Sequence, residues 1–274
     1  MHTYILKGDN LAYLKDDLIF ERLKDDYTYV ESMGYEIFGV FLFGSQNYGA
    51  DYENSDIDTR VVVLPKFSEI VNGSSPISTT KIKNTGEHID IKDFRVYIDQ
   101  LLKPSVGYLE DLCTKYRIIN PIYNDIMLSL SNLCNDIADQ NRLKIMLDIW
   151  GRKNSHEQRL KVGNNDRIES YGYDNKQVYN LVRLSEFIER FSNGESFTDC
   201  VTYTNPNYLI SLKRNPPPCN EALDIAKNAV NLIDRVYLDN FNKLRLARND
   251  NTASGALCDL RIEALKRYLR AVTK

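Results

Sequence analysis

Two apolar runs, separated by a segment rich in glycine and aspartate, constrain the fold of this chain more than any other feature. The stretch FLFGSQNYGADYENSDIDTRVVVLP, residues 41–65, carries strand-like apolar residues at both ends. A strand buried on both faces of a sheet has a nearly continuous apolar sequence. Carboxylates at the end of such a strand cost free energy unless a partner compensates their charge. The stretch therefore predicts two strands with a polar site between them.

Two aspartates lie at the start of the second apolar run. Asp56 and Asp58 are two positions apart, so in a strand their carboxylates point to the same face. Like charges this close repel each other and raise each other's pKa unless a cation compensates them. All-oxygen ligands favour Mg²⁺ or Mn²⁺ over zinc. We therefore predict that Asp56 and Asp58 bind a divalent metal ion.

A third carboxylate lies downstream in EHIDIKDF, where a strand would put His88 and Asp90 on one face. Asp90 together with Asp56 and Asp58 would bind two metal ions, the arrangement used for in-line displacement at phosphorus. Asp93 is the alternative third acid, but its position suits the N-cap of a following helix. We predict Asp90 as the third ligand, and as the acceptor of the proton from the attacking hydroxyl.

The Gly-Ser pair after the first apolar run predicts contact with phosphate. Gly44 and Gly49 bracket the sequence SQNY, and glycine lets a backbone approach a ligand closely. A short helix that begins at Ser45 would point free backbone N–H groups at a phosphate, and the serine hydroxyl would add a donor. Phosphate donors and a carboxylate metal site, eleven positions apart from Ser45 to Asp56, imply a nucleoside triphosphate bound with magnesium.

The segment GSQNYGADYENSDID resembles the Gly-Ser … Asp-x-Asp signature of the DNA polymerase β-type nucleotidyltransferase superfamily. The glycines, the serine before the first aspartate and the spacing between two apolar strands all match that signature. The resemblance implies a catalytic domain built on a mixed sheet flanked by helices. It also implies that Gly44 and Ser45 contact the triphosphate, and that Asp56, Asp58 and Asp90 hold two magnesium ions.

The segment YGYDNKQVYNLVRL resembles a motif of the RNA-repair group of that superfamily, which is associated with RNA ligases. That group carries Tyr-Gly-Tyr-Asp-x-Lys and then a histidine three residues before an Arg-Leu pair, and here Asn180 stands at the histidine position. YLISLKRN, residues 208–215, also resembles part of the group. The resemblance implies nucleotide contact by Tyr173, Lys176, Asn180 and Arg183, and it spans most of the chain with gaps between the motifs.

Helical periodicity groups three of these residues independently. Lys176 and Arg183 are seven positions apart, and Asn180 lies between them at steps of four and three. A helix therefore puts all three on one face. A Lys-Asn-Arg stripe would neutralise the departing pyrophosphate. The alternative is an ordinary solvated polar face, since the opposite stripe of this helix is apolar.

The pattern of the whole chain predicts an α+β fold. An amphipathic helix that ends at Gly34 precedes strand-like runs, and helical period dominates from about Asn120. The strand-like runs cover residues 35–44, 57–65 and 77–91, the last as one or two strands with a turn at 84–86. We predict a nucleotidyltransferase catalytic domain at residues 1–115, with a mixed sheet flanked by helices, followed by a helical domain at residues 116–274.

Composition limits the class of protein. The 274 residues are 43% hydrophobic and 27% charged with a net charge of −3, which is typical of a globular protein and disfavours a general DNA-coating function. No apolar run reaches the roughly 20 residues of a membrane span, and no signal-peptide pattern is present. Five scattered cysteines without a CxxC pair disfavour zinc and a disulfide framework. We therefore predict a cytoplasmic protein that does not bind membranes.

Three side chains near the predicted site each have two interpretations. Tyr48 would stack on a base or pack in the core, and Arg60 would pair with the acids or contact phosphate. His88 would contact nucleotide or metal, or would lie on a strand surface. With His2 and His156 it completes the three histidines of the chain, which form no plausible Ser-His-Asp set, so hydrolase chemistry is not predicted.

These patterns predict a template-independent enzyme that moves a nucleoside monophosphate from a magnesium-bound NTP to a hydroxyl and releases pyrophosphate. The acceptor that the resemblance implies is an RNA 3′ end, such as that of tRNA, in RNA repair. Residues 241–274 carry eight basic and three acidic residues, and this basic C-terminal part would contact such a polyanion unless it is a solvated helix face. The alternatives are a transferase that modifies a protein or a small molecule, and a non-catalytic nucleotide sensor. The NTP preference and the oligomeric state stay open.

Overall fold

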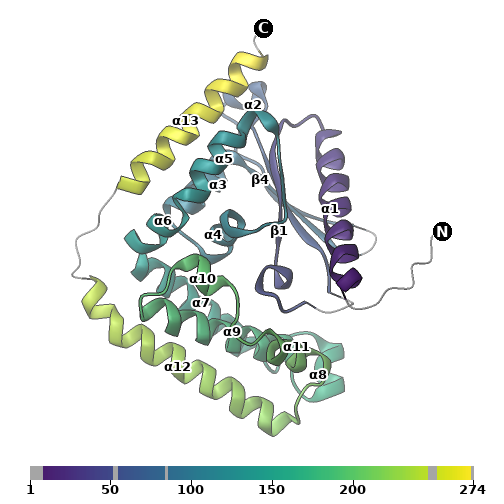
Figure 1. Cartoon of the computed structure of the whole chain (residues 1–274), viewed down its shortest axis with the longest axis vertical. Helices are drawn as coiled ribbons and strands as arrows, with labels where there is room; N and C mark the ends of the chain where they lie inside the picture. The colour runs from purple at the N-terminus through teal and green to yellow at the C-terminus, as the bar shows by residue number, and fades with distance from the viewer. Residues whose placement is uncertain (1–8, 52–54, 84–85, 246–251, 273–274) are drawn as a thin grey trace, which may run out of the picture.

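The computed structural model describes residues 9–51, 55–83, 86–245 and 252–272. A five-stranded mixed sheet with the order β3-β4-β2-β1-β5 forms the N-terminal part (Figure 1). The strands are β1 (Ile37–Phe43), β2 (Asp58–Val63), β3 (Ser78–Ile82), β4 (His88–Asp93) and β5 (Arg117–Ile119). β1 pairs antiparallel with β2 and β5, β2 pairs parallel with β4, and β3 pairs antiparallel with β4. The predicted α+β class is confirmed. Residues 84 and 85 of the predicted turn lie outside the described residues.

The two faces of β2 have different surroundings. Val61 and Val63 lie in an apolar cluster with residues of the first helix, whereas Val62 belongs to the core shared with the later helices. Arg60 is paired across the parallel ladder with Asp90, so both side chains share the face of Val62. This face looks toward the C-terminal helices, and the polar residues of the predicted site lie on that side of the sheet.

Helix α1 (Asp9–Glu31) covers the other face of the sheet (Figure 1). Its side chains Ile19, Leu23 and Val30 are fully buried against the strands, and their spacing of four and seven puts them on one helical face. Burial of each such side chain contributes roughly 1.5–3 kcal/mol. The apolar stripe read from the sequence therefore holds α1 on the sheet.

Two short helices cover the face of the sheet that carries Arg60. These are α3 (Phe94–Leu102) and α4 (Val106–Cys113). Asp93 caps α3, because its side chain accepts a hydrogen bond from the backbone N–H of Arg95. The predicted capping role of Asp93 is confirmed, and this rival third acid is held away from the predicted metal site.

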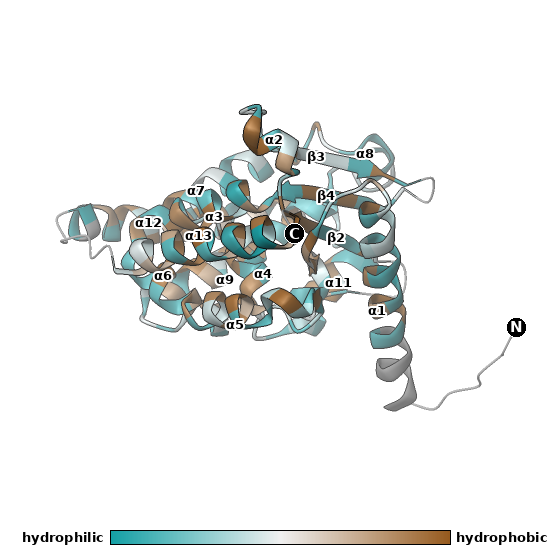
Figure 2. Cartoon of the chain, turned by 90° about the horizontal axis from the view of Figure 1, so that it is seen from above, coloured by the Kyte–Doolittle hydropathy of each residue, from teal (hydrophilic) through white to brown (hydrophobic). Residues whose placement is uncertain are grey.

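The C-terminal region is largely helical, as predicted. Helices α7, α9 and α12 pack against one another, and α9 contributes buried residues along its whole length. The helices of the region are α5 (Asn124–Asn132), α6 (Cys134–Gln140), α7 (Arg142–Arg159), α8 (Asn165–Tyr171), α9 (Asn175–Ser192), α10 (Phe197–Val201), α11 (Pro206–Arg214), α12 (Cys219–Arg245) and α13 (Thr252–Val272). Hydrophilic and hydrophobic stripes alternate along α7, α12 and α13 in Figure 2, as expected of helices with one apolar face.

Two elements cross the predicted boundary at residues 115 and 116. Strand β5 joins the sheet beside β1, and α13 returns to pack against α3 (Figure 1). The Arg261 guanidinium pairs with Asp99 at 2.7 Å, and Arg267 pairs with Asp125 at 2.6 Å. These two cations of the basic C-terminal part are therefore held by acids of the same chain. The division into two domains stays a prediction. No helix in the described part of the chain is long and apolar enough to cross a membrane.

Candidate active site

A cavity of about 330 Å³ lies between the end of the sheet and the C-terminal helices. The N-terminal part contributes the ends of β1 and β2 and the loop between them, and the helical part contributes α7, α8, α9 and α11. The residues that line the cavity are Phe43, Gly44, Ser45, Tyr48, Ser55, Asp56, Asp58, Arg152, His156, Arg167, Asn175, Lys176, Tyr179, Asn180, Arg183 and Lys213. Seven residues predicted from two distant sequence motifs therefore meet at one cavity.

The Gly-Ser turn forms one wall of this cavity. Gly44 has φ 98°, a conformation that favours glycine, and the short 3₁₀ helix η1 (Ser45–Tyr48) begins directly after it. The predicted short helix that begins at Ser45 is confirmed. The Gln46 side chain donates to the carbonyl of Asp56 at 3.2 Å, and the Asn47 side chain donates to the carbonyl of Leu42 at 2.9 Å. These bonds fix the turn to the end of β1 and to the segment just before β2.

Asp56 and Asp58 line the cavity where β2 begins. Asp58 Oδ1 accepts the backbone N–H of His88 at 3.3 Å. Burial and the nearby Asp56 raise the pKa of Asp58, although His88 and Lys176 act in the opposite direction. A divalent cation would relieve this unfavourable burial of negative charge. Magnesium is commonly held by one or two carboxylates together with phosphates of the substrate, so these two residues fit a magnesium-nucleotide complex.

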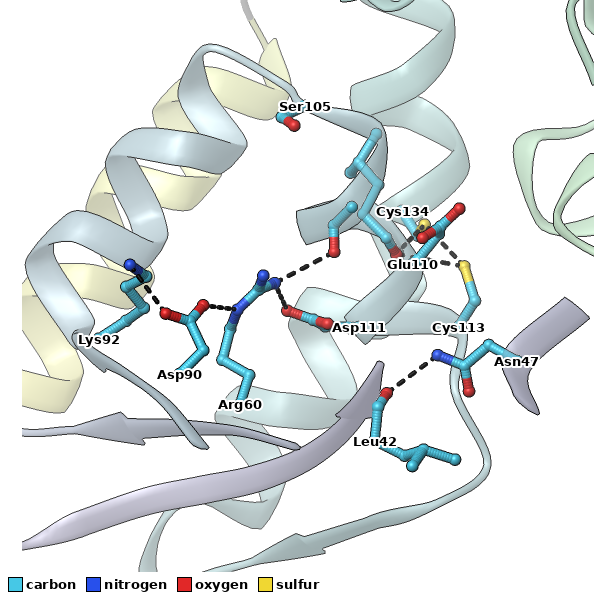
Figure 3. Close-up of polar contacts among 12 residues, drawn as sticks. Leu42, Asn47, Arg60, Asp90, Lys92, Ser105, Glu110, Asp111, Cys113 and Cys134 are labelled. Carbon is cyan, nitrogen blue, oxygen red and sulfur yellow. Dashed lines mark hydrogen bonds and ion pairs between the residues drawn. The ribbon is translucent and has the colours of Figure 1, made fainter. Parts of the chain in front are cut away.

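The structure does not bring Asp90 together with the other two predicted metal ligands, Asp56 and Asp58. Its Oδ2 accepts from Arg60 Nε at 2.9 Å, and its Oδ1 pairs with Lys92 Nζ at 2.9 Å (Figure 3). Asp90 is absent from the lining of the cavity. Within the part of the chain that the structure describes, no three His, Cys, Asp or Glu side chains are grouped so as to hold a metal ion. The register of the sheet is the reason, because it pairs Asp90 with Arg60 instead of Asp58.

Arg60 links the sheet to α4 beneath the site. Its guanidinium also pairs with Asp111 (Figure 3). It donates to the carbonyl of Gly107 at 3.1 Å and lies 4.0 Å from the ring centroid of Tyr108. Burial lowers the pKa of Arg60, but Asp111 and Asp90 raise it by more. The predicted salt bridge of Arg60 is therefore present. Its partners, Asp90 and Asp111, do not line the cavity.

The start of α9 forms the wall opposite the Gly-Ser turn. Asp174 caps the helix by accepting the backbone N–H of Lys176 at 3.1 Å. Lys176 and Asn180 line the cavity, as predicted. Tyr173 does not, because it is fully buried and its hydroxyl donates to the carbonyl of Pro217 at 2.8 Å. The structure thus places Tyr173 away from the cavity that the other predicted nucleotide contacts line, where it anchors the proline-rich segment before α12.

Arg183 reaches the cavity from α9 but is held by a buried partner. Its Nη1 donates to Glu110 Oε1 at 3.0 Å, and its guanidinium lies 3.8 Å from the ring centroid of Tyr48. The Tyr48 hydroxyl donates to the other oxygen of Glu110 at 2.9 Å. This trio ties η1, α4 and α9 together. Tyr48 is 8% exposed, so the packing interpretation describes it better than base stacking.

Sequence patterns missed several residues of the site. Lys213 comes from α11, where its Nζ donates to the carbonyl of Ala50 at 3.0 Å and lies 4.0 Å from the ring centroid of Tyr179. Burial, and then Lys176, lower the pKa of Lys213 to about 8. His156 and Arg152 come from α7. Lys213 lies in the segment 208–215 that resembles the RNA-repair group, and this resemblance was the one sequence feature that could have indicated it as a site residue. No local pattern pointed to α7.

The charge of the cavity is opposite to that of the whole chain. Five lysines and arginines line it against two aspartates, a balance of 5 − 2 = +3, whereas the chain carries −3. The cations are Arg152, Arg167, Lys176, Arg183 and Lys213. A larger cavity of about 550 Å³ lies on another side of η1, but it includes Asp16, Asp51 and Glu110 among its lining residues. The smaller cavity is therefore the better site for a polyphosphate.

Comparison of the sequence with models of known protein families found no match, and a search of curated proteins also found none.

Proposed function

We propose that this chain is a template-independent nucleotidyltransferase of the DNA polymerase β type. In this proposal it moves a nucleoside monophosphate from a magnesium-bound NTP to an acceptor hydroxyl and releases pyrophosphate. One observation carries the proposal: the Gly-Ser turn and the Asp-x-Asp pair line one cavity with five cations from α7, α8, α9 and α11. A polyphosphate needs cations around it, and its metal needs carboxylates beside it.

Each wall of the cavity has a task in this reaction. Gly44 and Ser45 would bind phosphate oxygens, and Asp56 and Asp58 would hold Mg²⁺ or Mn²⁺ together with the triphosphate. The bound metal would neutralise charge on the phosphates and stabilise the charge that develops during displacement. Lys176 and Lys213 would bind the leaving pyrophosphate from the opposite wall.

Asp90 carries no part of this mechanism. The sequence assigned it the third metal position and the proton of the attacking hydroxyl. Both of its oxygens are engaged by cations, Arg60 and Lys92. The proposal therefore rests on two carboxylates and on phosphate oxygens of the substrate as metal ligands. Asn180 lines the cavity as a neutral hydrogen-bonding group, and Arg183 supports the wall through Glu110.

The test is transfer of label from NTP to RNA. The chain is incubated with each α-labelled NTP, magnesium and total cellular RNA, and the products are separated on a denaturing gel. We expect labelled RNA from the natural chain and none from the double variant Asp56→Asn, Asp58→Asn. That variant keeps the size of both side chains and removes their charge, so its thermal unfolding controls for the fold.

Other outcomes redirect the proposal. Label on a protein or a small molecule would keep the reaction and replace RNA as acceptor. Bound NTP without any transfer would favour a nucleotide sensor. Equal transfer by the natural chain and the double variant would contradict the assignment of Asp56 and Asp58.

A further inference from the structure

A second cavity meets the nucleotide cavity at His156. This second cavity has a volume of about 440 Å³ and lies between α7, α8 and the start of α9. His156, Arg167, Lys176 and Asn180 line both cavities. His156 would therefore border a ligand in either cavity.

A chain of hydrogen bonds fixes which nitrogen of His156 carries its proton. Gln177 Nε2 donates to Asp174 Oδ2 at 2.8 Å. Burial raises the pKa of Asp174, but bonds from Gln177 and from the backbone lower it by more, so Asp174 stays a pure acceptor. The amide of Gln177 is therefore oriented with Oε1 toward His156 Nδ1, 2.7 Å away. Nδ1 must donate this bond, which leaves the lone pair of a neutral imidazole on Nε2.

The surroundings of His156 favour its neutral form. Burial lowers its pKa, Arg183, Arg152 and Arg159 lower it further, and the hydrogen bond with Gln177 raises it less. The charged groups that line the two cavities with His156 are Arg152 and Arg159 on α7, Arg167 on α8, Asp174, Lys176 and Arg183 on or just before α9, Lys213 on α11, and Asp56 and Asp58 near the start of β2. A neutral imidazole with an open Nε2 accepts a proton from a hydroxyl.

The second cavity suits a ligand that carries phosphate. Its cations are Arg159, Arg167 and Lys176, and its one acid is Asp174. Asp174 is 1% exposed and is occupied by the N–H groups of Asn164 and Lys176 and by the side chains of Gln177 and Arg167. The surface that faces a ligand is therefore cationic, which favours the backbone of a nucleic acid over a neutral acceptor.

We propose that the acceptor, a phosphate-bearing chain with a terminal hydroxyl, enters through the second cavity, and that His156 is the general base for that hydroxyl. This inference rests on the proposed function. The hydroxyl proton moves to His156 Nε2 while the oxygen forms a bond to the α-phosphorus of the NTP. The bond between the α-phosphorus and the bridging oxygen breaks, and pyrophosphate leaves with that electron pair. The imidazolium then returns its proton to water. His156 thus takes the role that the sequence assigned to Asp90.

The first test is the variant His156→Asn. Asparagine can still donate to Gln177 through its amide but has no basic nitrogen at the Nε2 position. With a short oligoribonucleotide as acceptor and saturating NTP and magnesium, we expect kcat to fall about 100-fold or more, with unchanged Kd for the NTP. The kcat of the natural chain should fall as the pH drops through the pKa of His156, below about 6.5, and the variant should lose this limb. Glu157→Gln, an exposed neighbour on α7, is the matched control and should match the natural chain.

Two further measurements separate a catalytic role from a structural one. Long-range ¹H–¹⁵N NMR of the ligand-free protein should show neutral His156 with its proton on Nδ1, assigned by the signal that His156→Asn removes from the three histidines. Arg159→Gln should raise KM for the oligoribonucleotide several-fold and leave KM for the NTP unchanged, because Arg159 lines the second cavity and not the first.

The outcomes separate a failure of this inference from a failure of the proposed function on which it rests. If the natural chain transfers nothing, the proposed function fails. If it transfers and His156→Asn keeps both the rate and the acid limb, the proposed function stands and the general base is wrong. A proton on Nε2 in the neutral protein would also overturn the inference. An unchanged KM for the oligoribonucleotide in Arg159→Gln would overturn the acceptor path.

Discussion

At the scale of single residues, burial and the partners of each cation in or beside the site determine its task. Arg60 and Arg183 are 7% and 6% exposed and pair with buried acids, so both act as supports. A buried ion pair that loses one partner leaves an uncompensated charge, which costs several kcal/mol. Lys213 is also largely enclosed, but it bonds a backbone carbonyl and packs on a tyrosine ring. Burial lowers the pKa of Lys213 to about 8, so its charge changes within the working pH range of most proteins.

Lys213 predicts a loss of nucleotide affinity at alkaline pH. A lysine is charged below its pKa, and the pKa of Lys213 is lowered to about 8 by burial and by Lys176. As the pH rises through about 8, the cation is lost and NTP binding should weaken about tenfold, which corresponds to one charge-assisted bond. Isothermal titration with a non-hydrolysable NTP between pH 6.5 and 9.5 measures this change. Lys213→Met should bind weakly throughout and lack the step. If the natural chain and Lys213→Met lost NTP affinity over the same pH range, a group other than Lys213 would be responsible.

At the scale of elements, the start of α9 is positioned by a close approach of the α7–α8 connection. A Cβ on Gly163 would lie 2.4 Å from Asp174 Oδ2 and 2.7 Å from the carbonyl oxygen of Arg159. These contacts are too short, so the absence of a side chain at Gly163 lets Asp174 cap α9 and orient Gln177. The nucleotide wall and the position of His156 both depend on this packing.

Gly163→Ala should therefore destabilise the chain, by about 1–3 kcal/mol, as overpacking does. Gly151→Ala is the matched control, since a Cβ there meets nothing within 4 Å and lies inside helix α7. The control should gain up to about 1 kcal/mol from helix propensity. Urea denaturation followed by circular dichroism measures both free energies of unfolding. Equal effects of the two substitutions would contradict the role given to Gly163.

At the scale of the whole molecule, one apolar core joins the sheet to the C-terminal helices. Phe38 and Phe41 of β1 belong to the same buried cluster as Leu181 of α9 and Ile233 of α12. Strand β5 and helix α13 both follow the predicted boundary in the chain and pack onto elements that precede it. A break at residue 115 would expose the edge of β1 and the outer side of α3.

A fragment of residues 1–115 should therefore not fold to the native sheet. It lacks β5, α13 and the later helices whose apolar side chains share one core with β1, and exposed apolar surface of this kind promotes aggregation. For the full chain we expect one cooperative unfolding transition. The single tryptophan, Trp150, reports on α7, so its fluorescence and far-ultraviolet circular dichroism should give the same midpoint. A folded fragment, or two separate midpoints, would support independent domains.

The sequence by itself determined the elements and the local geometry of the site. Strand alternation, helical period and the cap at Asp93 depend on residues a few positions apart, so each can be predicted from a short stretch of sequence. The same holds for Ser45 and Asp56, because both lie in the one connection between the adjacent antiparallel strands β1 and β2. The spacing within α9 likewise predicted that Lys176 and Asn180 share a face.

Only the tertiary structure decided which distant groups meet. The register between β2 and β4 gave Asp90 to Arg60, and the proline-rich segment before α12 enclosed Tyr173. The packing of α7 and α11 brought His156 and Lys213 to the cavity. None of these contacts has a local signature, because the same alternation or helical period is compatible with several registers and packings. The burial of apolar surface across the whole core selects one of them, and the polar side chains take the neighbours that this packing leaves.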